Sequence, residues 1–380
     1  MDSQERIDRA VALKPVPPGE TPVAPLIIHY TAKLAGLTQA DIFGSVGTWR
    51  DAADRAADRI GAFDMGFALW PTDVPFSEGM KYRLPGREPG DDEMFQVLEE
   101  EVMTREDYEE LVRVGYPRWS MDYYVRLQPS LRPGRISRGR TTAHFIRMAL
   151  RIRGNAKRLE KRGILPAFYG AGYPPFDFFS LARSFALFSE DLYDIPDLVA
   201  RACDASVEPI TATILQPLRI NGGRRVCIYP MRCSATFISP TMFEERALKH
   251  LVQMVETFVG KGITPLLHCD ANWTPMLHYF REMPRASCIL ELDDGTDIYR
   301  AKEILGDWMC IRGNLAPTLL AFGEVAEVEA ECERLIREVG RDGGFILGSG
   351  CEVPLNAKVE NVAAIRRVAR GLGRGAVPVA

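Results

Sequence analysis

"TMFEERALKHLVQMVETFVGKGITPLLHCDANW", residues 241–273, holds one complete passage from helix to strand. Apolar residues recur at helical spacing in its first half, and Ser239–Pro240 just before it is a favourable helix start. Gly260 and Gly262 end that pattern, and the apolar run Thr264–Cys269 follows. A run this apolar is typical of a strand buried on both faces of a parallel sheet.

Seven other apolar runs are candidate strands: Ala24–Tyr30, Phe63–Leu69, Leu165–Gly170, Arg225–Pro230, Ser287–Leu292, Trp308–Gly313 and Gly344–Ser349. Helical patterns at 297–305, 325–340 and 361–373 alternate with the later runs. This alternation predicts an α/β fold with a parallel sheet, and eight units favour an eight-stranded β/α (TIM) barrel. One domain is expected to span residues 1–380. Within it, residues 71–142 break the alternation and are predicted to form an inserted excursion after the second strand, with a hairpin and a short helix.

The composition argues against several classes of function. The chain has 380 residues, 46% of them hydrophobic, and its net charge of −4 does not indicate binding to nucleic acid or an anionic membrane. The amino-terminal sequence lacks a signal-peptide pattern, and no apolar run approaches the roughly 20 residues of a membrane span. We therefore expect a cytoplasmic protein. None of the eight cysteines forms a CxxC pair, which excludes a four-cysteine zinc knuckle.

Polar residues gather where the predicted strands end. In a β/α barrel the carboxyl ends of the strands surround a single mouth and carry the chemistry. The residues at those ends are His29, Tyr30, Tyr229, Arg232, His268, Cys269, Asp270, Glu291, Asp293, Asp294, Arg312, Asn314, Cys351 and Glu352. So many ionisable side chains beside apolar runs indicate an active site at that mouth.

Three of these residues predict a metal site. Side chains alternate along a strand, so His268 and Asp270 share a face while Cys269 points toward the helices. Cys351 reaches the same mouth from the eighth strand if the barrel closes. A histidine, a carboxylate and a thiolate suit zinc with an open fourth position, and the thiolate argues against magnesium or calcium. Such a zinc would act as a Lewis acid.

Each of these residues also has a simpler interpretation. A lone HxD pattern is a weak signal, so His268 as a histidine without metal is an equal alternative. Asp270 is also placed to cap a following helix, and Cys351 to be a buried thiol. Glu291, Asp293 and Asp294 are interpreted first as loop or cap carboxylates.

Three segments together resemble the uroporphyrinogen decarboxylase superfamily. They are "RIDRAVALKPVPPGETPVAPLI" (residues 6–27), "GITPLLHCDANW" (262–273) and the segment from "IRGNLAPTLL" to "VARGLG" (311–373). The resemblance implies a β/α barrel. The decarboxylase branch has an arginine-rich signature of the type "MRQAGRY", which holds the tetrapyrrole carboxylates. This chain has "IIHYTAKLAGL" there (27–37), so we expect no porphyrinogen clamp.

The other branch of the superfamily consists of cobalamin-dependent methyltransferases, which this chain resembles more. Their zinc is held by His-x-Cys after strand five and "GC" after strand eight. His268 and Cys351 match that pattern, and Asp270 stands where the first cysteine belongs. A carboxylate leaves zinc more electrophilic than a thiolate would, which favours activating a methyl donor rather than a thiol acceptor. The family's DxHxxG motif for corrinoid is absent from this chain, so cobalamin is expected on a partner protein.

The resulting hypothesis is a metal-assisted methyltransferase. It would move a methyl group from a small donor, of methoxy-aromatic or methylamine type, to a separate corrinoid protein. Tyr229, Arg232 and Glu352 would orient or protonate the substrate, and His29, Tyr30, Asp293, Arg312 and Asn314 would bind it.

The sequence leaves two alternative functions open, and it does not determine the oligomeric state. The first is a cobalamin-independent lyase or decarboxylase acting on an aromatic or carboxylated substrate. The second is a non-enzymatic binding subunit. No nucleic-acid or membrane partner is expected, and a homodimer is compatible with the sequence.

Overall fold

The computed structural model describes residues 1–71, 80–87, 89–127 and 135–371. Its strands are β1 (Met65–Gly66), β2 (Lys81–Arg83), β3 (Gln96–Leu98), β4 (Leu165–Pro166), β5 (Ala171–Gly172), β6 (Arg225–Ile228), β7 (Thr264–Cys269), β8 (Ile289–Leu292), β9 (Cys310–Leu315) and β10 (Phe345–Ser349). The six strands from β5 to β10 form one parallel sheet in chain order. β1 and β4 form a separate parallel pair, and β2 and β3 an antiparallel one.

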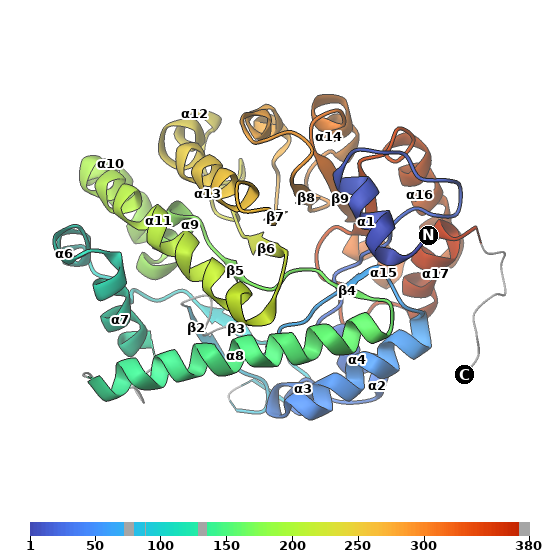
Figure 1. Cartoon of the computed structure of the whole chain (residues 1–380), viewed down its shortest axis with the longest axis horizontal. Coiled ribbons are helices and arrows are strands. Elements are labelled where there is room, and N and C mark those ends of the chain that lie inside the picture. The colour runs from blue at the N-terminus through green and yellow to red at the C-terminus, as the bar shows by residue number, and fades with distance from the viewer. Residues whose placement is uncertain (72–79, 88, 128–134, 372–380) are drawn as a thin grey trace.

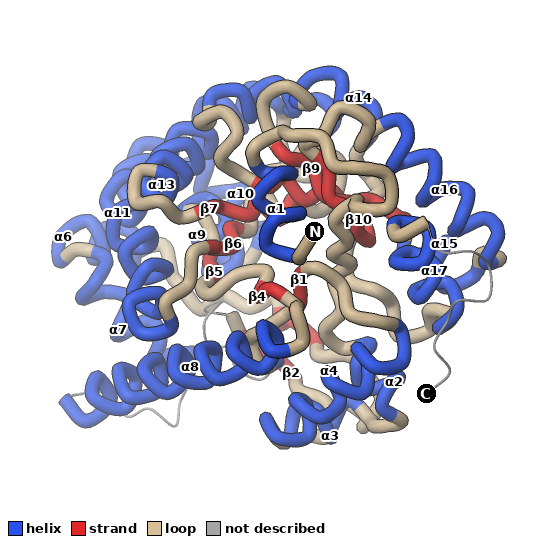
Figure 2. The backbone as a smooth tube through the Cα atoms, turned by 45° about the vertical axis from the view of Figure 1, so that its right-hand side comes forward, coloured by secondary structure: helices blue, strands red, loops and turns tan. Residues whose placement is uncertain are grey.

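Helices surround the strands, which lie together near the centre of the molecule (Figures 1 and 2). They are α1 (Ser3–Val11), α2 (Tyr30–Ala35), α3 (Gln39–Gly44), α4 (Val46–Ile60), α6 (Glu106–Val114), α7 (Tyr116–Leu127), α8 (Arg135–Lys161), α9 (Pro175–Arg183), α10 (Phe185–Asp194), α11 (Pro196–Asn221), α12 (Pro240–Phe243), the π-helix η2 (Glu244–Leu248), α13 (Lys249–Val259), the 3₁₀-helix η3 (Thr274–Glu282), α14 (Ile298–Leu305), α15 (Pro317–Phe322), α16 (Val325–Glu338) and α17 (Val359–Ala369). None of the described helices is long and apolar enough to cross a membrane.

The second half of the chain follows the sequence pattern closely. The helix predicted after Ser239 begins at Pro240, where the Ser239 hydroxyl accepts a hydrogen bond from the Met242 N–H at 3.1 Å. It continues through η2 and α13 to Val259, and β7 occupies Thr264–Cys269. All six residues of β7 are buried or half-buried, as a strand covered on both faces requires.

The first predicted strand is wrong as a strand. Residues 24–30 form only a single parallel bridge, from Leu26 to Glu352, and Tyr30 begins helix α2. Pro25 has no N–H to donate to a strand ladder, which interrupts pairing in an apolar run whose residues are buried or half-buried. Apolar periodicity therefore identified the burial of this segment but not its hydrogen bonding.

The excursion predicted at residues 71–142 falls partly on residues 72–79, 88 and 128–134, which lie outside the described residues. Its described part contains the antiparallel pair β2–β3, the helices α6 and α7, and the first turns of α8. The sequence predicted one short helix here, and the described residues of the excursion contain two before α8. The division between the helices was not evident in the sequence, because Gly115 alone separates α6 from α7.

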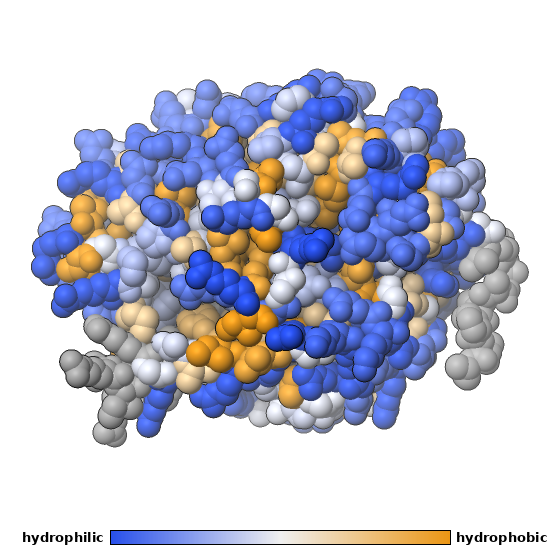
Figure 3. Space-filling view, viewed as in Figure 1, coloured by the Kyte–Doolittle hydropathy of each residue, from blue (hydrophilic) through white to orange (hydrophobic). Residues whose placement is uncertain are grey.

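Helix α8 runs along the outside of the molecule (Figure 1). Arg158, near its carboxyl end, pairs with Asp51 and Asp54 of α4. Figure 3 shows a mostly hydrophilic face with an apolar area where α8 passes the end of α11. Ile146 and Leu150 of α8 are 45% and 51% exposed.

The register of the sheet sets three polar residues in a row. His268 on β7 pairs with Glu291 on β8, and Glu291 pairs with Arg312 on β9. Neighbouring strands lie about 4.8 Å apart, so side chains at paired positions on one face are in contact range. The parallel pairing thus delivers an imidazole, a carboxylate and a guanidinium to one line across the buried sheet.

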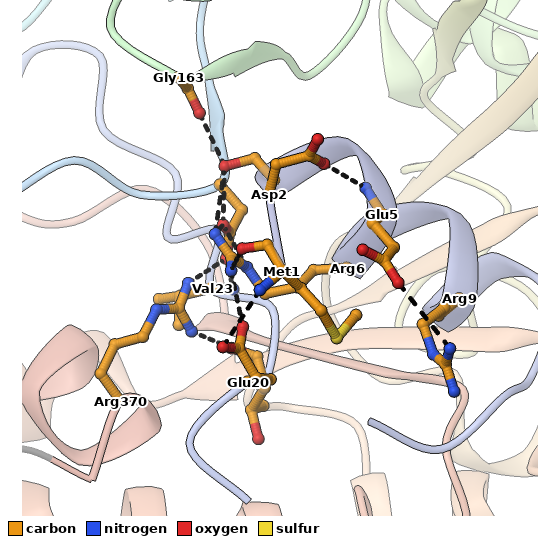
Figure 4. A network of polar contacts seen from close by, with 12 residues as sticks. Met1, Asp2, Glu5, Arg6, Arg9, Glu20, Val23, Gly163 and Arg370 are labelled. Atoms are coloured by element: carbon orange, nitrogen blue, oxygen red, sulfur yellow. Dashed lines mark hydrogen bonds and ion pairs between the residues drawn. The ribbon is translucent and has the colours of Figure 1, made fainter. Parts of the chain in front are cut away.

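At the amino ends of the strands, buried Asp64 joins both ends of the chain. Its carboxylate accepts hydrogen bonds from Arg6 Nε (2.8 Å) and Arg370 Nη2 (2.7 Å), and from the Val23 N–H (2.7 Å). Figure 4 shows Arg6 and Arg370 converging there, with Glu20 also bound to Arg6. This network fixes α1 and α17 across the end of the sheet opposite to His268.

Replacing Asp64 tests how much this network stabilises the fold. Asp64→Ala leaves two arginines without their buried partner, and we expect it to lower the free energy of unfolding by about 3–5 kcal/mol. Urea denaturation monitored by circular dichroism measures the difference. Glu5→Gln, which changes an exposed carboxylate 4.0 Å from Arg9, is the control and should change stability little. Equal, small effects of the two substitutions would contradict this account.

Candidate active site

His268 lies between two carboxylates. Its Nδ1 is 3.0 Å from Glu291 Oε1, and its Nε2 is 3.1 Å from Asp270 Oδ1. Glu291 is 2% exposed and also bonds Arg312, whose Nε donates to the Ala24 carbonyl at 2.8 Å. Glu291 was predicted as a loop or cap carboxylate, and this is wrong, because it belongs to buried β8 and links His268 to Arg312.

The two carboxylates stabilise positive charge at His268. Burial disfavours the imidazolium, but the negative charges of Asp270 and Glu291 outweigh it and raise the pKa of His268 well above its ordinary value. Burial likewise works against the charged form of Glu291, yet Arg312 and His268 lower the pKa of that carboxyl. A proton or a cation beside Nε2 would meet the same electrostatic demand.

His268, Asp270 and Cys351 form a cluster with the composition of a metal site. One donor atom from each lies within 4.8 Å of the others. Because Glu291 binds Nδ1, Nε2 is the nitrogen left to face Asp270 and Cys351, an arrangement usual for metal-bound histidine. Burial raises the pKa of the Cys351 thiol, although its hydrogen bond with His268 opposes that shift. Cys269 is buried and does not belong to the cluster.

A second polar pair, His29 with Glu352, lies on the same cavity. His29 Nδ1 is 2.8 Å from each carboxylate oxygen of Glu352, and the His29 backbone N–H donates to Oε1 at 2.6 Å. The imidazole packs on Phe43 and Phe95, with ring centroids 5.5 and 5.2 Å away. Although the first strand is missing, its end residue His29 therefore reaches the site.

The cavity that connects the two polar groups has a volume of about 210 Å³. Aromatic side chains form much of its wall: Phe67, Tyr82, Phe95, Phe168, Tyr173 and Tyr229. His268, Cys351, His29, Glu352, Glu291 and Arg312 also line it. A larger cavity of about 350 Å³ lies between α7, α8 and α11, but none of the described residues that line it has an acidic, basic, histidine or cysteine side chain. The smaller cavity is therefore the candidate active site.

Four predicted site residues lie away from this cavity. The Tyr30 hydroxyl donates to the Ala357 carbonyl at 2.9 Å in the core. Asp293 accepts from the N–H groups of Ala271 and Gly295, and Asn314 donates to the Asp293 and Thr296 carbonyls. Arg232 pairs with Glu99, beyond the end of β3. The first three stabilise core and loop structure, and Arg232 joins the loop after β6 to the segment after β3.

Buried Asp177 holds the loop that follows Tyr229. Its Oδ1 accepts the Arg232 N–H at 2.6 Å. Burial raises the pKa of Asp177 to about 7, against the opposing backbone hydrogen bonds from Arg232 and Cys233. The aromatic stretch containing it gave no sequence signal for this role, and neither Tyr82 nor Phe95 of the excursion was predicted to line the site.

A parallel α/β fold with ionisable residues at its strand ends is an arrangement typical of enzymes. A family model described as "Uroporphyrinogen decarboxylase (URO-D)" matches residues 141–372. The chain belongs to the URO-D family. The matched region contains all three residues of the metal-type cluster but not His29.

Individual relatives are distant. The chain is 25% identical over 196 residues to a uroporphyrinogen decarboxylase of Pelobacter propionicus, covering 50% of this chain and 55% of that one. It is 26% identical over 240 residues to one of Trichlorobacter lovleyi, covering 60% and 65%. It thus spans about half to two thirds of the length of these two curated relatives. A solved methyltransferase from Methanosarcina mazei has the same fold, with a TM-score of 0.69, 18% identity and 98% of each chain covered.

Asp177 gives a pH-dependent prediction. Its folded pKa of about 7 exceeds the ordinary 3.8, so the folded state holds the proton more tightly and loses stability as pH rises from about 4 to 7. Relative to Asp177→Asn, the parent should lose about 2–3 kcal/mol between pH 5 and pH 8. Urea midpoints of both proteins at the two pH values measure this. Exposed Asp122→Asn is the control, and a parent–Asp177→Asn difference that stays constant with pH would contradict the assignment.

Proposed function

We propose that this enzyme is a methyltransferase that moves a methyl group from a small donor, of methoxy-aromatic or methylamine type, to a corrinoid carried by a separate protein. One observation carries the proposal: Glu291 binds His268 Nδ1, while Nε2 faces Asp270 and Cys351. The methyltransferase with the same fold supports the class of reaction. The corrinoid partner and the donor type belong to the proposal.

The side chains fit zinc. The cluster contains one nitrogen, one oxygen and one sulfur donor, and leaves a fourth position for substrate. The Asp270 Oδ1 atom is buried and lies 3.1 Å from His268 Nε2, a separation compatible with two ligands of one ion. When bound, zinc would act as a Lewis acid toward the atom that loses the methyl group.

The remaining residues have positional roles in this proposal. Glu291 and Arg312 hold the His268 ring, since their buried ion pair fixes the Glu291 carboxylate. The Tyr229 ring packs edge-on against His268, with centroids 5.7 Å apart, and forms a wall for the donor. The aromatic walls of the cavity would pack against the donor in this proposal.

The proposal takes the parallel segments as one closed eight-stranded ring with a single mouth. Backbone hydrogen bonds support this, because they join the segment around Val23 and Ala24 to β10 on one side and to the start of β1 on the other. The Ala24 N–H donates to the Leu347 carbonyl of β10, and the Asp64 N–H, next to β1, donates to the Val23 carbonyl, each at 2.8 Å. Leu165 N–H then donates to Asp64 O at 2.9 Å, next to β4.

A lyase or decarboxylase is the second candidate, because the curated relatives are uroporphyrinogen decarboxylases. The cavity favours it less for a substrate with several carboxylates. Apart from the two imidazoles, Arg312 is the one basic side chain among the described residues that line the cavity, and it is already paired with Glu291. Recognition of several carboxylates would need further cations.

Metal content tests the site. Protein purified without chelators should contain about one zinc per chain, and Cys351→Ala should lose it, because two ligands remain. Cys269→Ala is the matched control: it removes a buried thiol outside the cluster and should retain zinc. Elemental analysis with circular dichroism separates metal loss from unfolding. Normal zinc in Cys351→Ala would show that Cys351 is structural.

Methyl transfer is tested with free cob(I)alamin as the acceptor. The zinc-loaded protein should form methylcobalamin from methoxybenzenes or methylamines, seen as an absorbance change, at least about 100-fold faster than His268→Ala. His278→Ala alters an exposed histidine on η3 and should match the parent. If no donor methylates the corrinoid while an aromatic carboxylate releases carbon dioxide, the lyase alternative replaces this proposal.

A further inference from the structure

The His29–Glu352 pair presents a fixed polar edge at the cavity. The carboxylate contacts both Nδ1 and the backbone N–H of His29, so ring and backbone are held together. His29 is 4% exposed, and Phe43 and Phe95 pack against its ring. This imidazole therefore has little freedom to rotate.

The carboxylate also selects the tautomer. An acceptor at Nδ1 requires the hydrogen there, which leaves Nε2 of the neutral ring as a hydrogen-bond acceptor. Nε2 is buried and has no partner among the described residues. A buried polar atom without a partner is costly, and His29 lines the cavity. A hydrogen-bond donor on a bound molecule would relieve that cost.

The charges around the cavity restrict what else that molecule carries. Among the described lining residues the acidic groups are Glu291 and Glu352, and the sole guanidinium or ammonium group is that of Arg312. The Arg312 guanidinium already pairs with Glu291 and donates to the Ala24 carbonyl. A carboxylate on the ligand beside His29 would meet Glu352 at close range, and no arginine or lysine side chain among the described lining residues is unpaired to balance it there.

We propose that the His29–Glu352 pair recognises a hydroxyl group on the methyl donor, and that the donor class is an uncharged hydroxylated aromatic ether, a methoxyphenol. The inference rests on the proposed function and narrows its substrate. Aromatic walls take the ring, and the hydroxyl donates to His29 Nε2. Glu352 acts through His29 as a positioning residue and does not touch the donor.

Binding of paired probes tests the proposal without any methyl transfer. Isothermal titration calorimetry compares 2-, 3- and 4-methoxyphenol with methoxybenzene, which lacks the hydroxyl, and with the matching methoxybenzoates. In the parent, the best methoxyphenol should bind at least about tenfold tighter than methoxybenzene, because a buried acceptor is left unpaired without the hydroxyl. The methoxybenzoates should bind more weakly than methoxybenzene.

Variants locate the contact. His29→Phe keeps an aromatic ring and should reduce the methoxyphenol-to-methoxybenzene ratio to about one. His278→Phe makes the same substitution at an exposed position of η3 and should keep the parent ratio. Glu352→Gln retains the shape of the side chain but no longer fixes the tautomer, so it should lower the ratio without abolishing it. A general folding defect would weaken both probes equally and leave the ratio unchanged.

Several outcomes would overturn this inference: a parent ratio near one, a ratio unaffected by His29→Phe, tightest binding by a methoxybenzoate, or binding of none of the probes. Each leaves methyl transfer from other donors open. Conversely, a hydroxyl-dependent ratio in a protein that transfers no methyl group would support the recognition role and reject the proposed function.

Discussion

The buried carboxylate of Glu291 is the constraint on which the candidate site depends. It lies on a central strand, 2% exposed, where an unpaired charge would be very costly. Arg312 on one neighbouring strand and His268 on the other satisfy it, and Arg312 extends the chain of contacts to the Ala24 carbonyl. Removing either partner would leave a charge in the sheet. The orientation of His268 is thus a consequence of sheet pairing, not of loop conformation.

The two ends of the sheet are built for different purposes. At the amino ends, the buried Asp64 carboxylate binds Arg6 and Arg370. At the carboxyl ends, the charged residues border an open cavity with aromatic walls. This division agrees with the general rule for β/α enzymes, in which one face stabilises the fold and the other carries chemistry.

The sequence was most informative about features that depend on the residues of a single helix or strand. Apolar runs and a capping serine placed β7 and its preceding helix, and side-chain alternation correctly separated His268 and Asp270 from Cys269. It was least informative about neighbours across strands. The link from Glu291 to His268 depends on register between β7 and β8, which no periodicity within one strand contains.

Residues after a strand end were also hard to assign. Asp293 directly follows β8 and Asn314 lies near the end of β9, but their side chains satisfy nearby backbone groups and do not reach the cavity. Tyr82 and Phe95 line the cavity but come from the β2–β3 hairpin, which is not part of the main sheet. Only the three-dimensional path of the excursion could reveal them.

Cys351 and Glu352 are consecutive residues in different parts of the site. Cys351 belongs to the metal-type cluster, and Glu352 binds His29. A parallel bridge from Leu26 to Glu352 ties this short turn to the segment that carries His29. An insertion or deletion in the turn would therefore disturb both halves of the site at once. During divergence of such enzymes, a change of substrate preference at this turn would have to proceed by side-chain replacement alone, at constant loop length.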